Sequence, residues 1–373
     1  MKLNKKTLIP IFIGFLLIFG VLTTSIHACT GIRLTATDNG VVYGRSMEWG
    51  KFDLQSRVTI IPEGYSFIGL TPDGNNGKKW NAKYGFVGLD MMGKDFIADG
   101  MNEVGLAAGL FYHMGFAEYP SYEKKEAKNT ITALDVTYYI LSQFSTIEEV
   151  REGMPKVRVV PVVQEEIGIP VYAHWMVTDP KGNSITIEFR NGDMIIFDNP
   201  LGVITNGPTY DWHMMNLRNY VNLSPVAFPD KKIENLDFSP MGAGSGMIGL
   251  PGDNTPPSRF VRAVAWSQTA RPTPTADETV YETFRILDNF NLPLGSAEGS
   301  DNSIDLGEMR SSTIWTTAWN LTDHVLNYHT QHNRRVRALY LDKIDFADIG
   351  NNIIHIPLDT KKNQDIEDIT PPK

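Results

Sequence analysis

The sequence predicts an α+β protein built from layered antiparallel sheets, and its size and segment order predict this class. Strand-like segments occur as runs of hairpins towards both ends of the chain, and the helical segments are grouped between those runs. The regular alternation of strand and helix that a doubly wound parallel sheet requires is missing. With 373 residues, 42% hydrophobic and 21% charged, the chain has a globular composition and enough length for a substantial core.

The first element is a hairpin. Residues 31–36 and 41–45 alternate between apolar and polar or small side chains, and Asp38-Asn39-Gly40 supplies the turn between them. Folding the chain back about this turn brings Cys29 close to residues 45–49, which include Arg45 and Glu48. The hairpin alone therefore places a cation and a carboxylate near a thiol.

The remaining elements follow in order along the chain. Apolar residues at helical spacing predict a helix over 130–144, and a capping box at 145–148 predicts the start of a second, short helix. Turns at 180–183 and 191–192 predict a strand meander over 172–203. Two further helices are expected at 258–268 and 276–289, before the chain returns to strands at 335–341.

The amino terminus has the pattern of a secretory signal peptide. Three lysines within the first six residues precede an apolar run over about 8–22, and Ala28 is a small residue before a cleavage point. We expect residues 1–28 to be a signal peptide, 29–356 to form one domain and 357–373 to be a polar tail. The expected location is periplasmic or secreted. A lipid-anchored protein acylated on Cys29 and an uncleaved membrane anchor are the alternatives.

Cleavage after Ala28 would make the only cysteine of the chain, Cys29, its first residue. That residue would carry both a nucleophilic thiol and an α-amine with an ordinary pKa of about 8, which suits a general base. Arg45 would lower the thiol pKa, and Glu48 would accept a hydrogen bond from the ammonium. A surface ion pair is the alternative for these two charged residues.

Further candidates lie later in the chain. Asn206, in the turn 204–208, offers an uncharged N–H for an oxyanion, although Asn-Gly-Pro is also ordinary turn chemistry. Arg259 begins a helix after a glycine-rich loop that lacks a phosphate-binding signature. His174 is the candidate base of a rival Cys–His hydrolase. The spacing of His324, His329 and His332 matches no metal motif, so we expect no metal.

Net charge argues against nucleic-acid binding, and cysteine content excludes an internal disulfide. The net charge is −9, and loss of the three signal lysines makes it −12, which is unfavourable for nucleic-acid binding. A single cysteine permits no intramolecular disulfide.

Together these segments resemble the choloylglycine hydrolase family, which includes bile salt hydrolases and penicillin V acylases. The resemblance is carried in order by residues 29–33, 44–49, 98–103 with 105–106, 205–212 with 216–217, and 249–253 with 258–260. It implies an αββα sandwich of two antiparallel sheets, the N-terminal nucleophile hydrolase fold, and no cofactor.

The resemblance also implies roles for individual residues. Cys29 would be the nucleophile, Arg45 and Glu48 would organise it, Asn206 would line the oxyanion hole, and Arg259 would complete the catalytic set. The second oxyanion donor would be a backbone N–H near Phe111.

Two positions depart from the family pattern. Glu48 stands where Asp is common. Phe111 and Tyr112 lie where some relatives have a polar residue, so they would enlarge an apolar substrate wall. The expected substrates are small N-acyl amides: conjugated bile salts, penicillin V or N-acyl homoserine lactones. Relatives often form tetramers, which makes a homotetramer the expected assembly. A binding protein of the same fold, anchored by lipid, is the alternative function.

Overall fold

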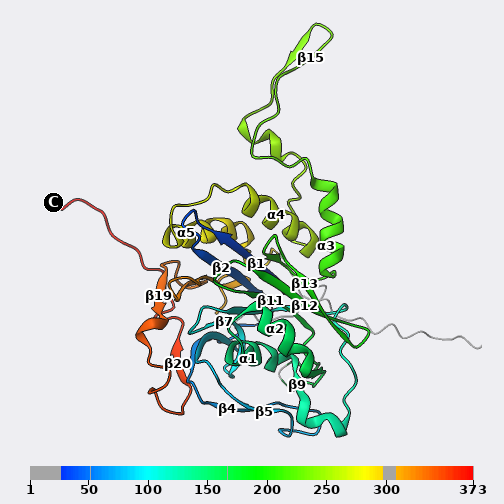
Figure 1. The fold of residues 1–373 in the computed structure, drawn as a ribbon. Helices are drawn as coiled ribbons and strands as arrows, with labels where there is room; N and C mark the ends of the chain where they lie inside the picture. The colour runs from blue at the N-terminus through cyan, green and yellow to red at the C-terminus, as the bar shows by residue number, and fades with distance from the viewer. Residues whose placement is uncertain (1–26, 51, 166, 297–307, 373) are drawn as a thin grey trace, which may run out of the picture.

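The computed structural model describes residues 27–50, 52–165, 167–296 and 308–372, and two antiparallel sheets form its centre (Figure 1). The signal-peptide prediction falls almost entirely outside the described residues. Among the helices of the described part, none has the length and apolar character needed to cross a bilayer.

The first sheet has six strands, and the hairpin predicted from the sequence lies near its middle. Its order is β14 (Val203–Ile204), β1 (His27–Thr35), β2 (Val41–Trp49), β17 (Thr313–Asn320), β18 (Val325–Thr330) and β19 (Arg337–Tyr340). The second sheet has eight strands. Its order is β13 (Asp193–Asp198), β12 (Ser184–Arg190), β11 (Ala173–Thr178), β8 (Ala107–Tyr112), β7 (Phe96–Asn102), β6 (Phe86–Met91), β3 (Arg57–Ile61) and β20 (Ile354–Pro357).

Helices cover the outer face of each sheet. On the first sheet, α4 (Pro256–Thr269) packs on β1 and α5 (Ala276–Leu287) packs on β2 and β17. On the second, α1 (Ala133–Gln143) packs on β7 and β8, with α2 (Ile147–Gly153) following it. Figure 1 shows the resulting order of helix, sheet, sheet and helix, which confirms the predicted αββα sandwich.

Smaller elements complete the chain. They are β4 (Ser66–Ile68) with β5 (Lys79–Asn81), β9 (Thr130–Thr132) with β10 (Arg158–Val160), β15 (Lys231–Ile233) with β16 (Leu236–Phe238), and α3 (Tyr210–Asn216). Short 3-10 turns occupy Lys124–Asn129, Met154–Lys156, Leu217–Tyr220, Ala243–Met247, Asp288–Phe290 and Leu341–Lys343.

Helix boundaries differ from the prediction in two places. The helix predicted from residue 130 begins at Ala133, because residues 130–132 form β9 and Thr132 caps the helix through Leu134 N–H. The second capping box is displaced by one residue: Thr146 is the cap of α2 and accepts from Glu149 N–H. The meander agrees with the prediction, and the helices α4 and α5 begin and end within two residues of the predicted bounds.

Two segments extend from the sandwich. The segment 221–250, called the arm below, carries the β15–β16 hairpin and projects away from the body (Figure 1). The carboxyl-terminal tail is polar, but its first part contacts the body. Pro357 pairs with Arg57 in the second sheet, and Asp359 accepts hydrogen bonds from Thr330 and Arg337 beside the first.

Candidate active site

Cys29 lies in β1 opposite Met47 of β2, and Ala28 lies opposite Glu48. The hairpin prediction is thereby confirmed. Because successive side chains of a strand point to opposite faces, Cys29, Arg45 and Met47 face the second sheet, and Glu48 faces the helices. The peptide bond between Ala28 and Cys29 is intact in this structure, so the Cys29 nitrogen is an amide.

Arg45 is the cation on the thiol side. It is completely buried, and its Nη1 donates to the carbonyl oxygens of Ala98 at 2.9 Å and Leu110 at 2.7 Å. Its guanidinium lies over the Phe111 ring, 4.2 Å from the centroid. Burial raises the pKa of the Cys29 thiol, and the charge of Arg45 acts in the opposite direction.

Arg259, from α4, holds the backbone of the same cysteine. Its Nη1 donates to Cys29 O at 2.6 Å and to Thr30 Oγ1 at 3.0 Å, and its Nη2 donates to Asn206 Oδ1 at 2.6 Å. Burial lowers the pKa of Arg259 to about 10, against the charge of Glu48. The guanidinium remains charged at neutral pH and links the strand of the thiol to Asn206.

Glu48 is a buried carboxyl with few partners. Its Oε1 lies 3.4 Å from Thr313 Oγ1, and its Oε2 accepts no hydrogen bond from any residue that the structure describes. Burial raises the pKa of Glu48 to about 7, although the charge of Arg259 opposes that shift. A buried carboxyl oxygen without a donor has the capacity to accept an additional N–H.

The side chain of Asn206 is fixed at both ends of its amide. Oδ1 accepts from the Cys29 N–H at 2.9 Å as well as from Arg259, and Nδ2 donates to Tyr112 O at 2.8 Å. These partners define which end of the amide is oxygen, because a carbonyl only accepts and a backbone N–H only donates. The amide nitrogen is therefore directed to the Tyr112 carbonyl at the end of β8.

The structure separates the roles expected of Phe111 and Tyr112. The N–H of His113 donates to Tyr172 O. Hydrogen-bonded pairs recur at every second residue of an antiparallel ladder, so the N–H of Phe111, two residues earlier, also points towards β11. The N–H of Tyr112 points to the opposite side, as does its carbonyl, which Asn206 contacts. Of these two N–H groups, that of Tyr112 is therefore the candidate for the backbone donor that the sequence predicts near Phe111.

The expected place of the Phe111 side chain is also corrected. It is completely buried beneath Arg45 and does not line the cavity at the thiol. Strand alternation explains this, because neighbouring residues of β8 face opposite ways. Tyr112 does line the cavity. The lack of a side chain at Gly31 leaves room for the buried ring, because a Cβ at this position would lie 2.6 Å from Phe111 Cζ.

The cavity at the thiol is mostly apolar, as its lining shows. The lining residues are Cys29, Met47, Glu48, Trp49, Leu54, Met91, Met92, Leu110, Tyr112, Ile167 and Val171. Such a surface suits an apolar group adjacent to the bond that the thiol attacks.

Asp99 is a buried residue that the sequence analysis did not single out. Its Oδ1 accepts from Tyr43 at 2.9 Å, and its Oδ2 accepts from Thr317 at 2.8 Å and Trp319 at 2.6 Å. Burial raises the pKa of Asp99, whereas the charge of Arg45 lowers it. In the sequence, its position within the segment 98–103, which contributes to the family resemblance, could have indicated its importance.

The rival with His174 as base does not fit this geometry. Its Nδ1 lies 3.4 Å from Glu188 Oε1 and its Nε2 lies 3.1 Å from Thr205 O, so both ring nitrogens face other groups. His324 pairs with Asp342 instead of joining His329 and His332 in a cluster.

The layers and the cysteine on the first strand of a central sheet define the N-terminal nucleophile hydrolase fold. The model of the choloylglycine hydrolase family of linear amide C–N hydrolases matches residues 29–355. The chain belongs to this family and is a linear amide hydrolase.

Individual relatives agree with this assignment. A bile salt hydrolase/transferase of Clostridium perfringens is 33% identical over 331 residues, covering 87% of this chain and 95% of the relative. A penicillin V acylase of Pectobacterium atrosepticum is 25% identical, covering 85% and 81%. Among solved structures, a variant of the conjugated bile acid hydrolase from Clostridium perfringens has a TM-score of 0.76 at 28% identity, covering 92% of this chain and all of that one.

Proposed function

We propose that Cys29, freed by removal of residues 1–28, hydrolyses N-acyl amides through a thioester. One observation carries the proposal: the backbone nitrogen of Cys29 lies 2.9 Å from Asn206 Oδ1, and the thiol of the same residue lines the apolar cavity together with Glu48. Cleavage would turn that nitrogen into an amine within reach of its own side chain.

The proposed reaction begins when the amine takes the thiol proton and the sulfur attacks the amide carbonyl. Asn206 Nδ2 and the N–H of Tyr112 donate to the oxyanion. The ammonium protonates the leaving amine, and water then releases the acid from the thioester. Glu48 Oε2 accepts from the ammonium and orients it. No step requires a metal or an organic cofactor.

The lining of the cavity favours substrates with an apolar acyl group. Three methionines, four aliphatic side chains and Trp49 line it, and flexible methionines adapt to acyl groups of irregular shape. Conjugated bile salts, penicillin V and long-chain N-acyl homoserine lactones all present such a group beside an amide. The first two classes are named in relatives of this chain.

The test is hydrolysis of that panel by protein beginning at Cys29. We expect acid release from at least one member and its loss in Cys29→Ser. A chain that retains Ala28 should be inactive. Full activity of that extended chain would refute the amine as base. Folded Cys29 protein with no turnover of any member would instead support the binding protein of the same fold.

Export is part of the same proposal, because cleavage is what exposes the amine. We propose that the cleaved protein is periplasmic or secreted. Cell fractionation and N-terminal sequencing test this: a mature terminus at Cys29 supports it, and recovery of the full chain from the cytoplasm contradicts it. Mass spectrometry of Cys29 separates a free terminus from the lipid-anchored alternative, since an acylated amine cannot act as a base.

For assembly we propose a homotetramer in which the arm packs against other copies. Figure 1 shows the arm projecting away from the body. Several apolar side chains of the arm are exposed. The exposed ones are Val221, Val226, Phe228, Ile233, Leu236, Phe238, Met241 and Ile248. A clustered apolar surface of this kind is typical of an interface. Light scattering should give four chains, and replacement of 226–245 by a short glycine–serine linker should give a smaller species.

A further inference from the structure

Three buried histidines outside the proposed catalytic set bind the loop that carries Asn206. They are His174 on β11, His213 on α3 and His113, which follows β8. Their Nε2 atoms lie 3.1, 2.9 and 3.2 Å from the carbonyl oxygens of Thr205, Asn206 and Pro208, respectively. A carbonyl oxygen only accepts, so each Nε2 carries the proton and donates it.

His213 is the histidine that contacts Asn206 itself. Its ring donates to the Asn206 carbonyl and stacks on Phe260, with centroids 4.5 Å apart and planes 13° apart. Phe260 is adjacent to Arg259 on α4, whose Nη2 holds the Asn206 side chain. The backbone of Asn206 is thus held by α3 and its side chain by α4, and the stack of His213 on Phe260 joins the two helices.

His174 supports the loop and also contacts the buried carboxyl group of Glu188. Its two ring nitrogens face two different acceptors, Thr205 O and Glu188 Oε1. Burial acts to raise the pKa of Glu188, but the hydrogen bond and charge of His174 hold it at about 2. Glu188 also accepts from Tyr210 N–H at 2.7 Å, which fixes the start of α3 after the loop.

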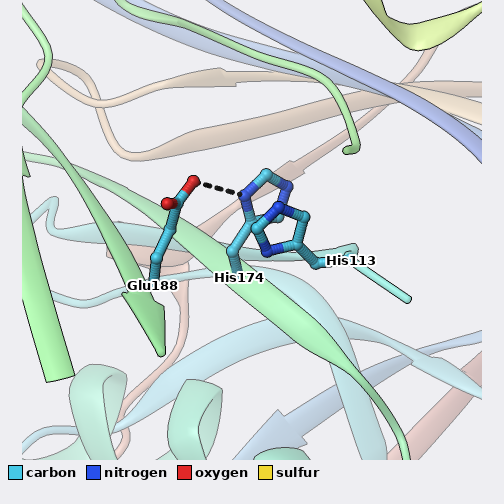
Figure 2. Close-up of side chains that lie close together, drawn as sticks. All are labelled: His113, His174 and Glu188. Carbon is cyan, nitrogen blue, oxygen red and sulfur yellow. Dashed lines mark hydrogen bonds and ion pairs between the residues drawn. The ribbon is translucent and has the colours of Figure 1, made fainter. Parts of the chain in front are cut away.

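His113, His174 and Glu188 also have ligand atoms within 4.8 Å of one another, as in a metal site. Their geometry does not suit a shared metal ion. Figure 2 shows the two rings stacked, with centroids 4.0 Å apart and planes 14° apart. A metal lies in the plane of each imidazole that binds it, at about 2.0–2.1 Å for zinc, and two parallel planes this far apart share no such point. The cluster is a support for the loop.

We propose that His113, His174 and His213 are positioning residues that set the oxyanion donor, and that His213 has the largest effect on turnover. This rests on the proposed role of Asn206. The amide of Asn206 must be placed before the reaction, because an oxyanion donor stabilises charge only where that charge develops. Errors of about 1 Å in such placement cost about a hundredfold in rate.

The test compares His213→Leu with His213→Gln in protein beginning at Cys29, using whichever panel substrate is turned over. Leucine has no donor, whereas the Gln amide nitrogen takes a position near that of Nε2. We expect His213→Leu to lower kcat about tenfold or more with little change in KM, and His213→Gln to recover most of it. His329→Leu is the matched control, because His329 is also buried but lies on β18, against Phe284.

A double-mutant cycle with Asn206→Ala separates this inference from the proposed function. Asn206→Ala should lower kcat about 10²–10³-fold, and adding His213→Leu should then cost little more. If Asn206→Ala retains full kcat, the proposed oxyanion role fails. If Asn206→Ala lowers kcat and His213→Leu does not, the positioning role fails while the oxyanion role stands. The same conclusion follows if the two reductions in kcat multiply in the double variant.

A measurement that does not depend on turnover completes the test. Amide hydrogen exchange of residues 205–213 should accelerate in His213→Leu and remain near the native rate in His213→Gln and His329→Leu. Unchanged exchange in His213→Leu would overturn the inference even if no substrate were found.

Discussion

Glu48 makes the stability of the uncleaved chain depend on pH in a way that cleavage should abolish. While the Ala28–Cys29 bond is intact, burial raises the pKa of Glu48 from 4.5 to about 7. Between these values the unfolded chain has released a proton that the folded chain retains, so stability falls as pH rises from about 4.5 to 7. A difference of about 2.5 pKa units corresponds to about 3 kcal/mol.

Urea denaturation measures this effect in a chain that begins at Ala28. The free energy of unfolding is compared with that of Glu48→Gln at several pH values, because the difference removes the titration of all other groups. We expect the glutamine variant to gain about 3 kcal/mol relative to the parent as pH rises from 4.5 to 7. In chains beginning at Cys29 the ammonium pairs with Glu48, and the gain should disappear or reverse.

Two results would refute this reasoning. A difference that does not change with pH in the Ala28 chain would mean that Glu48 is not buried as a neutral acid. The same pH dependence in both chains would mean that the new amine does not contact Glu48.

Three further predictions concern the supports of the thiol. Arg45→Met leaves two buried carbonyls without a donor, so unfolding free energy should fall by about 2–6 kcal/mol in urea titrations; a change below 1 kcal/mol would contradict that role. Gly31→Ala forces a methyl against Phe111 and should cost about 1–3 kcal/mol in the same assay, whereas native stability would show that the ring can move. Asp99→Asn removes a negative charge near Arg45 while keeping the size of the side chain. It should lower the Cys29 pKa, measured from the pH dependence of alkylation; an unchanged or raised value would contradict this.

The sequence was sufficient for the features that local chemistry controls. The Asp38-Asn39-Gly40 turn and the alternation beside it determine the hairpin register, and that register alone places Cys29 opposite Met47. The helices α4 and α5 were predictable for the same reason, since their apolar spacing is local.

Contacts between distant segments were not predictable to the same degree. A shift of one position along a strand moves a side chain from one face of the sheet to the other. The assignment of Phe111 to the core and Tyr112 to the cavity therefore depended on the pairing of β8 with β11. The support of the Asn206 loop by three histidines joins β8, β11 and α3. No spacing within the sequence indicates that their rings converge on one loop.

In the proposed mechanism, the buried charges of the site would link cleavage before Cys29 to activity. Before cleavage, Arg45 and Arg259 are balanced by Asp99 and by a Glu48 carboxyl whose pKa is about 7. A new ammonium at Cys29 would add positive charge to a buried region, where unbalanced charge is costly. It would therefore favour ionisation of Glu48 and of the thiol. The two arginines would in turn disfavour the protonated amine, which keeps that amine available as a base. Processing of the chain would thus supply the base and, by the same charge, lower the pKa of its nucleophile.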